Sequence, residues 1–127
     1  MKKKVKSVLI LILILVVLSG CSGNNQLTME KDLEENSIKY KEIIEVTFKN
    51  SKANKDIKII YDFEEEENAV NMFYTLKMVM PDGTKVEQDG KRVLMETTFE
   101  EFGEKELEGK TKEEIKKILE QDEYQEV

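Results

Sequence analysis

Two stretches of the chain alternate apolar and polar residues with the period of a half-buried β-strand, residues 42–49 and 56–63. A polar stretch at 50–55 separates them. Because this connection is short, we expect the two strands to pair as an antiparallel hairpin. The apolar positions are Ile44, Val46 and Phe48 in the first strand, and Ile57, Ile59, Tyr61 and Phe63 in the second.

The period then changes, and residues 62–80 carry apolar side chains at helical spacing. Asp62 and Glu65 have the spacing of a capping box, and Pro81 ends the pattern. A strand over 73–80 is the competing interpretation, since apolar residues also alternate there. We prefer the helix. Its apolar face is formed by Ala69, Phe73, Leu76 and Met80.

A second hairpin is expected over residues 84–98, because Asp89-Gly90 supplies the positive φ angles of a two-residue type I′ turn. Residues 99–109 are irregular, with Phe99 and Phe102 against the core.

The last predicted element is a helix that opens with Thr111-Lys112-Glu113-Glu114, a capping box of the usual residue types. Its apolar stripe is Ile115, Ile118 and Leu119.

These elements predict a single small α+β domain over residues 37–127, with the element order ββαββα. The expected architecture is a four-stranded, mainly antiparallel sheet with two helices on one face. Residues 21–36 are interpreted as a flexible tether, because residues 22–36 are polar and show no sustained apolar period. A short helix starting with Leu27, Met29 and Leu33 is the alternative there.

The first 21 residues have a different pattern from the alternating segments that follow. Four lysines precede an unbroken apolar run over residues 8–18, the pattern of an export leader. These eleven residues reach about 16 Å as a helix, whereas a transmembrane helix must cross ~30 Å of hydrocarbon. The run ends in Leu18-Ser19-Gly20-Cys21, which resembles the lipobox of bacterial lipoprotein precursors.

This resemblance implies that residues 1–20 are a signal peptide recognised through Leu18, Ser19 and Gly20. It also implies diacylglycerol transfer to the Cys21 thiol, cleavage before Cys21, and a mature protein anchored on the extracytoplasmic face of the cell membrane. Two acyl chains suffice for stable anchoring. The alternatives are an uncleaved anchor or an ordinary secretory leader. Cys21 is the only cysteine, so no intramolecular disulfide is possible.

Charge and composition exclude several classes of function. Removal of the leader lysines leaves 16 basic against 27 acidic residues, so the formal charge becomes −11 instead of −7. An acidic surface of this kind disfavours binding to nucleic acid or to anionic headgroups. The chain has no histidine, which removes Ser-His-Asp and Cys-His catalysis and the usual zinc sites.

The remaining candidates for chemistry have simpler structural explanations. Glu64–Glu67 could bind Ca²⁺, but consecutive helical residues point about 100° apart, so a solvated helix start is preferred. A glycosidase-like pair among Glu96, Glu100 and Glu101 is expected by chance in so acidic a chain. Core filling is preferred over peptide binding for Met72, Met78, Met80 and Met95. No site is assigned to Tyr40, Tyr61, Tyr74 or Tyr124.

The leader, the element order and the segment 111–120 are together similar to the small uncharacterised lipoproteins of Gram-positive bacteria, including the YehR-like ones. The sequence points to no catalytic residue, metal site or cofactor. We therefore expect a lipid-anchored binding or interaction module for an envelope protein or a small ligand. The alternative is an accessory lipoprotein that takes a small amphipathic ligand or a cation in a groove between sheet and helices.

Overall fold

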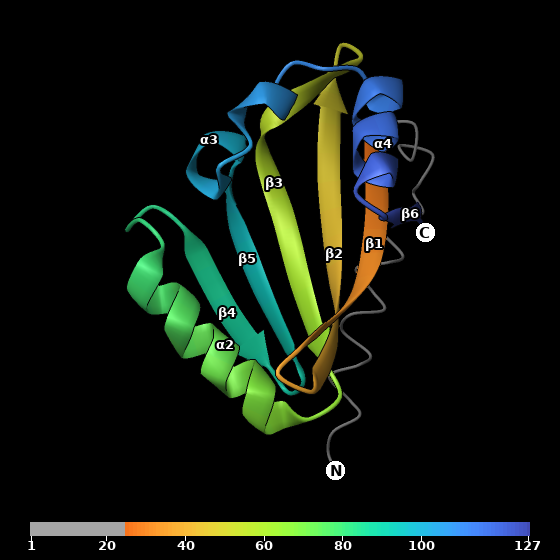
Figure 1. The fold of residues 1–127 in the computed structure, drawn as a ribbon. Helices are drawn as coiled ribbons and strands as arrows, with labels where there is room; N and C mark the ends of the chain where they lie inside the picture. Colours follow the sequence, from red (N-terminus) through yellow and green to blue (C-terminus); the bar gives the residue numbers. More distant parts are fainter. Residues whose placement is uncertain (1–24) are drawn as a thin grey trace.

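The long half of the sheet is a meander of three strands joined by two tight turns (Figure 1). In the computed structural model, which describes residues 25–127, β1 (Gln26–Glu35) pairs antiparallel with β2 (Ile38–Lys49), and β2 with β3 (Lys52–Phe63). The turns are Asn36-Ser37 and Asn50-Ser51, and all four residues have positive φ. Positive φ at both central residues is what a type I′ turn requires, and this turn matches the twist of the strands it joins.

The second half of the sheet returns to the first after a helix. β5 pairs antiparallel with β3, so the order across the sheet is β4-β5-β3-β2-β1-β6. A short helical segment crosses the end of the sheet and leads to the last helix and to β6, which pairs with β1. In chain order these elements are α2 (Glu66–Val79), β4 (Lys85–Asp89), β5 (Arg92–Thr98), α3 (Phe99–Phe102), η2 (Lys105–Leu107), α4 (Lys112–Gln121) and β6 (Gln125–Glu126).

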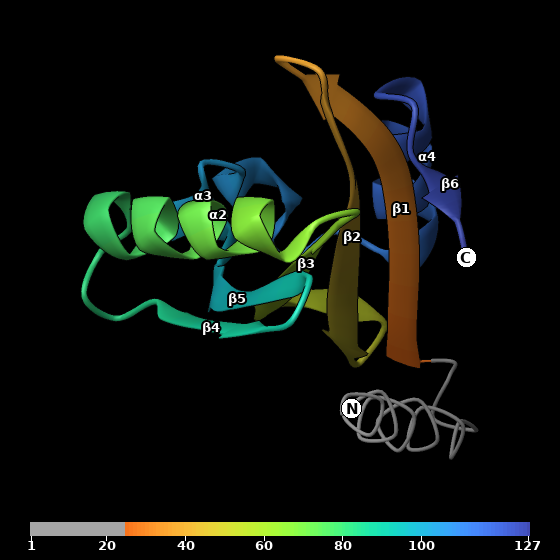
Figure 2. The same cartoon turned by 90° about the horizontal axis from the view of Figure 1, so that it is seen from below.

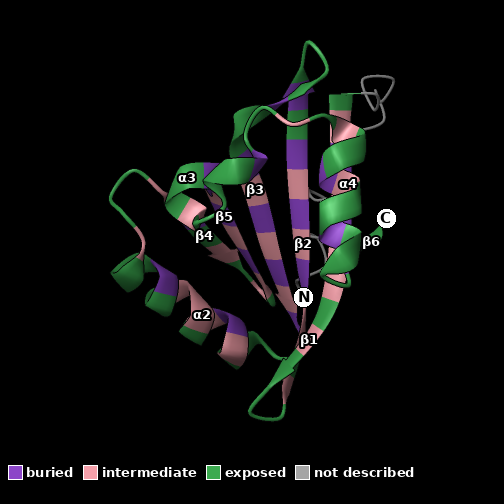
Figure 3. Ribbon diagram, turned by 45° about the horizontal axis from the view of Figure 1, so that its top comes forward, coloured by how far each residue is buried: buried purple, intermediate pink, exposed green. Residues whose placement is uncertain are grey.

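Only one face of the sheet is deeply buried, and the helices of residues 25–127 lie on it (Figures 2 and 3). The register explains this burial, because directly opposed residues share a face. Met29 lies opposite Ile44, Ile44 opposite Ile59, and Ile59 opposite Met95, a continuous apolar row across four strands. α2 contacts β3, β4 and β5, whereas α4 contacts β1 and β6. Together these side chains form one core.

The two long helices are where the sequence predicts them. α2 buries Ala69 and Leu76 and ends at Met80, immediately before Pro81, so the helical interpretation of 73–80 is confirmed. α4 opens with the predicted capping box: the Thr111 hydroxyl accepts from the Glu114 N–H, and the Glu114 carboxylate accepts from the Thr111 N–H. Ile115 and Leu119 face the core, as expected.

The predicted four-stranded ββαββα fold is wrong, because residues 25–127 form a six-stranded sheet with three α-helices. Residues 26–35, which we interpreted as tether, form β1, with Leu27 and Met29 almost completely buried. The alternative helix there is wrong too. At the other end of the chain, β6 adds a short strand beyond β1.

Two local predictions also need correction. Asp62 does not cap α2, because it lies in β3 and binds Arg92; the residue before α2 is Glu65, whose side chain makes no capping hydrogen bond. The turn of the second hairpin is Gly90-Lys91, since Asp89 pairs with Arg92. Only the first of these two residues has positive φ, which is the pattern of a type II′ turn and not of the predicted type I′.

Candidate functional site

The structure separates the two ends of the sheet, which we call proximal and distal. The proximal end contains Gln26, where the described strands begin, and the turn Asn50-Ser51 (Figure 1). The distal end contains the turn Asn36-Ser37 and the end of β3 at Phe63. The predicted site residues Leu18, Ser19, Gly20 and Cys21 lie outside the described residues. The chain therefore enters the sheet from its proximal end.

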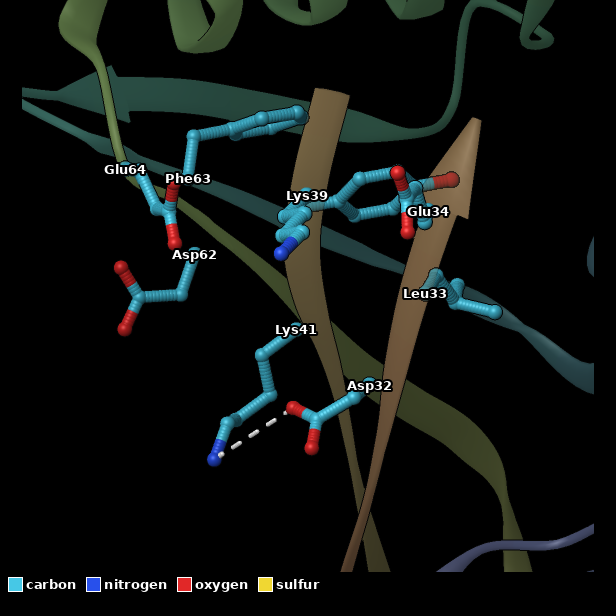
Figure 4. A pocket seen from close by; sticks show the side chains of 9 residues that line it. Asp32, Leu33, Glu34, Lys39, Lys41, Asp62, Phe63 and Glu64 are labelled. Carbon is cyan, nitrogen blue, oxygen red and sulfur yellow. Dashed lines mark ion pairs between the residues drawn. The ribbon is translucent and has the colours of Figure 1, made fainter. Parts of the chain in front are cut away.

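An open depression of about 560 Å³ lies at the distal end (Figure 4). We call it the distal depression. Three consecutive residues from each of three neighbouring chain segments line it: Asp32, Leu33 and Glu34 of β1; Lys39, Tyr40 and Lys41 of β2; and Asp62, Phe63 and Glu64 at the end of β3. Its volume falls in the range of ligand-binding pockets, about 300–1,000 Å³.

The middle row of this depression is apolar. Leu33 lies directly opposite Tyr40, and Tyr40 directly opposite Phe63. The Tyr40 and Phe63 rings stack with their centroids 4.9 Å apart and their planes 23° from parallel. Stacking against a buried neighbour holds the half-buried Tyr40 ring in place. Burial raises the pKa of the Tyr40 hydroxyl, and the nearby Glu35 and Glu42 carboxylates raise it further. The hydroxyl therefore remains a hydrogen-bond donor at neutral pH.

The rows on either side alternate charge across the strands. Asp32 lies opposite Lys41, and Lys41 opposite Asp62. The Lys41 ammonium is 3.4 Å from Glu30 and 3.8 Å from Asp32, and Figure 4 marks the second of these pairs. Glu34 and Lys39 form the outer row with Glu64. Because successive side chains of a strand point to opposite faces, these charged side chains lie on the outer face of the sheet, whereas those of Leu33, Tyr40 and Phe63 point to the core face. The depression thus carries four carboxylates and two ammonium groups.

This arrangement suits an occupant that carries a positive charge. The excess of carboxylates attracts Lys, Arg or an amine. Among the lining residues, the only hydroxyl is that of Tyr40.

A second polar cluster lies in the core, where sequence reasoning assigned no site. The Glu42 side chain is 9 % exposed, and its Oε1 accepts a hydrogen bond of 2.7 Å from the Tyr124 hydroxyl. Burial raises the pKa of Tyr124 and of Tyr61, and the Glu42 carboxylate raises both further. Lys31 lies over the Tyr124 ring at 5.2 Å and pairs with Asp122 at 3.6 Å. This cluster joins the end of the chain to β1 and β2.

Of the carboxylates singled out in the sequence, Glu96 and Glu101 line a second open depression of about 500 Å³. Glu64 to Glu67 are all exposed around the start of α2. Glu96 lies 4.0 Å from Lys58, Glu101 accepts from the Thr97 hydroxyl, and Glu100 is exposed. Within residues 25–127 no three acidic or cysteine side chains are grouped as metal ligands.

The methionines divide between core and surface. Met95 is buried and Met72 and Met80 pack against the core, as predicted, but the Met78 side chain is 82 % exposed. It lies on the outer side of α2 with Tyr74 and Val79, which are also exposed.

Sequence reasoning missed Glu42 and the residues of the distal depression, although signals for both exist. Glu42 occupies an inward position in the alternation of β2, where a charged residue interrupts an apolar series. The signal for the depression is the repeated dipeptide Asn-Ser. Asn36-Ser37 stands at the end of one polar-apolar alternation and Asn50-Ser51 at the end of the next.

Comparison of the chain with protein-family models, curated proteins and solved structures gives no match. The helices of residues 25–127 are all too short or too polar to cross a membrane.

Proposed function

We propose that this protein is a lipid-anchored binding module that holds its distal depression away from the membrane, on the extracytoplasmic face. The observation that supports this most directly is the position of Gln26. The lipobox cysteine is five residues before Gln26, and Gln26 is at the opposite end of β1 from the depression.

The distance from Cys21 to Gln26 and the length of β1 are consistent with this arrangement. Five residues span at most about 18 Å, so an acyl chain on Cys21 keeps the proximal end close to the bilayer. From Gln26 to Glu35, β1 extends about 30 Å at ~3.3 Å per residue. The depression therefore lies roughly one domain length away from the membrane and is open to the surroundings.

The chemistry of the depression indicates the class of occupant. The excess of carboxylates favours a segment of an envelope protein that carries Lys or Arg. A small amphipathic ligand in a sheet-helix groove has less support. The apolar cavity under α4, lined by residues such as Ile44, Leu107 and Leu119, has a volume of only about 90 Å³. Drug-sized ligands occupy about 300 Å³ or more.

The anchor is tested on the mature protein isolated from cells. We expect partition into detergent and an N-terminal mass that includes a diacylglycerol on Cys21. A Cys21→Ser variant should remain unprocessed and unacylated. Normal maturation of that variant, or an unmodified Cys21 in the natural protein, would sink the lipoprotein assignment.

Binding is tested by photo-crosslinking in intact cells. A photoreactive side chain is placed at Glu34, which is exposed in the depression, and as a matched control at Asn54, which is exposed near the proximal end. We expect one protein product from position 34 that disappears when Asp32→Lys and Glu64→Lys reverse two of the four carboxylates. Identical products from both positions, or membrane lipid alone from position 34, contradict binding at the depression.

A further inference from the structure

The proximal end of this acidic protein is basic. Residues 46–55 include Lys49, Lys52 and Lys55 and no acidic residue, in a chain where 27 of 127 residues are acidic. All three lysines are exposed. They surround the turn Asn50-Ser51, and we call this segment the lysine tip. In Figure 1 it stands at the top of the molecule, beside the loop that leads into α4.

The lysine tip has an unfavourable arrangement within the fold. Lys49 lies directly opposite Lys52 and closes the β2–β3 hairpin, and like charges placed opposite each other destabilise a hairpin. The β4–β5 hairpin closes with the opposite charges Asp89 and Arg92. None of the three tip lysines forms an ion pair with another residue of the described chain. An external anion would relieve this repulsion.

A neighbouring segment packs against the tip and offsets part of its charge, because Lys52 is near enough to Glu114 to lower the pKa of that carboxyl. The Ala53 N–H donates to the Lys110 carbonyl at 2.8 Å, and the Gly109 N–H donates to the Ala53 carbonyl at 3.1 Å. Lys110 and Lys112 add positive charge on this side, although Glu108, Glu113 and Glu114 offset it. The turn itself is therefore the most basic part of the proximal end.

The position of the tip relative to the anchor identifies what it faces. Gln26 lies opposite Thr47, so Lys49 and the start of the turn at Asn50 project two to three residues beyond the point where the chain enters the sheet. At ~3.3 Å per residue this is about 7–10 Å. The five residue steps from Cys21 to Gln26 span at most about 18 Å. The turn can therefore reach the headgroups of the leaflet that holds the lipid.

We propose that the lysine tip docks on the anionic headgroups of the membrane and so fixes the orientation of the domain, with the distal depression pointing away. This inference rests on the proposed lipid anchor. The net negative charge of the mature protein does not prevent this docking, because headgroup attraction falls off within a Debye length of about 8 Å and acts only on the nearest groups. Each lysine near the surface favours docking about fivefold, so three lysines make the orientation with the tip on the membrane roughly a hundredfold more populated than it is on a neutral membrane.

The test uses the mature full-length lipoprotein in vesicles of phosphatidylcholine, or of phosphatidylcholine and phosphatidylglycerol in equal amounts. A nitroxide label is attached to Ser51→Cys or, as a matched control, to Ser37→Cys in the other Asn-Ser turn. We expect a water-soluble relaxation agent to lose access to the label at 51 severalfold on the anionic vesicles. Access at 37 should be the same on both. Salt at about 1 M, where the Debye length is ~3 Å, should restore access at 51.

A second test reverses the charge of the lysine tip. The triple variant Lys49→Glu, Lys52→Glu and Lys55→Glu should abolish the protection at 51. The control triple Lys39→Glu, Lys91→Glu and Lys117→Glu makes the same change in net charge at exposed positions outside the tip, and should retain the protection. The salt experiment needs no charge variant, so it decides the matter even if the first triple variant folds poorly.

The outcomes separate the two proposals. Equal access at 51 on both kinds of vesicle overturns the docking inference. Equal protection by soluble polyphosphate on neutral vesicles also overturns it, in favour of a wall polyanion. Reaction of the unsubstituted protein with the labelling reagent at Cys21 would show a free thiol. That result overturns the lipid anchor itself, and with it the basis of the inference.

Discussion

The hydroxyl of Tyr124 donates a hydrogen bond to Oε1 of Glu42, which is 2.7 Å away in space and 82 residues away in sequence. Both residues are buried. This contact joins the end of the chain to the second strand. It also gives the buried Glu42 carboxylate a hydrogen-bond donor.

We expect Tyr124→Phe to lower the free energy of unfolding by about 2 kcal/mol, because a hydrogen bond to a charged group is worth about 1.5–3 kcal/mol. Urea unfolding followed by circular dichroism measures the change. Tyr74→Phe is the control, since Tyr74 is exposed on α2 and its loss should change stability by less than ~0.5 kcal/mol. Equal effects of the two substitutions would contradict a special role for the buried contact.

The buried tyrosines also predict alkaline sensitivity. Burial first, and then Glu42, raise the pKa of Tyr61 and Tyr124 above the ordinary value of 10.0. Their contribution to stability is fully present below pH 10 and is lost as the pH rises through the folded-state values, because the unfolded chain releases these protons first. Thermal unfolding between neutral pH and strongly alkaline pH should show this decline. It should be shallower in Tyr124→Phe. An unchanged slope in that variant would rule out Tyr124 as a source of the decline.

The capping box of α4 gives a prediction with a conservative control. Thr111→Ala removes the oxygen that accepts from the Glu114 N–H, and loss of such a cap costs about 1 kcal/mol. Thr111→Ser keeps the oxygen and should behave nearly as the natural protein does. Chemical denaturation of both variants measures this difference, and similar losses in both would mean that the hydroxyl is not the cause.

Acid should weaken the same capping box. The backbone N–H of Thr111 lowers the pKa of the Glu114 carboxyl. Its contribution is therefore present above the unfolded-state pKa and is lost as the pH falls through the lower, folded-state value. A Glu114→Gln variant should differ from the natural protein at neutral pH and approach it in acid. A constant difference in thermal unfolding temperature across this range would contradict the assignment.

The turn residues Ser37 and Ser51 predict stabilising changes. Both have φ near 70°, a conformation that costs a residue with a Cβ about 1–2 kcal/mol and glycine almost nothing. Ser37→Gly and Ser51→Gly should therefore each raise the unfolding midpoint in urea, by analogy with the favoured Asn-Gly turn. Gly90→Ala should lower it, because Gly90 has φ of 65°. Destabilisation by both glycine variants would argue against these turn conformations.

Deletion of β1 tests where the domain begins. A chain that starts at residue 37 loses Leu27 and Met29, which are 1 % and 0 % exposed, and each such side chain contributes about 1.5–3 kcal/mol. We expect this chain to lack a cooperative unfolding transition, whereas one that starts at residue 25 should unfold cooperatively. A folded chain from residue 37 would mean that β1 is dispensable.

Periodicity and capping were sufficient to predict five of the longer elements, because β2, β3, β5, α2 and α4 each have a local signal. β1 was missed because Lys31 interrupts its apolar alternation and charged residues dominate its second half. The inward side chains of β1 nevertheless lie opposite inward side chains of β2, as Met29 lies opposite Ile44. That pairing is not visible in the sequence of β1 alone.

The errors at Asp62 and at the distal depression have a common physical origin. Local spacing made Asp62 a helix cap, but Arg92, thirty residues later, binds its carboxylate at 3.1 Å. The depression requires the register of three strands, one of which was not predicted. Contacts of this kind depend on which strands become neighbours, and the pattern along one segment does not contain that information.

The meander of β1, β2 and β3 also has a kinetic consequence. Its two-residue turns close loops at the smallest entropic cost, so these three strands need only local encounters to pair. The hydrogen bond from Val127 to the Thr28 carbonyl, by contrast, spans nearly the whole described chain. We expect the meander to gain amide protection early in refolding and β6 to gain it last, which pulsed hydrogen exchange can follow. For a chain exported as we propose, this order lets folding begin before the last residues have crossed the membrane.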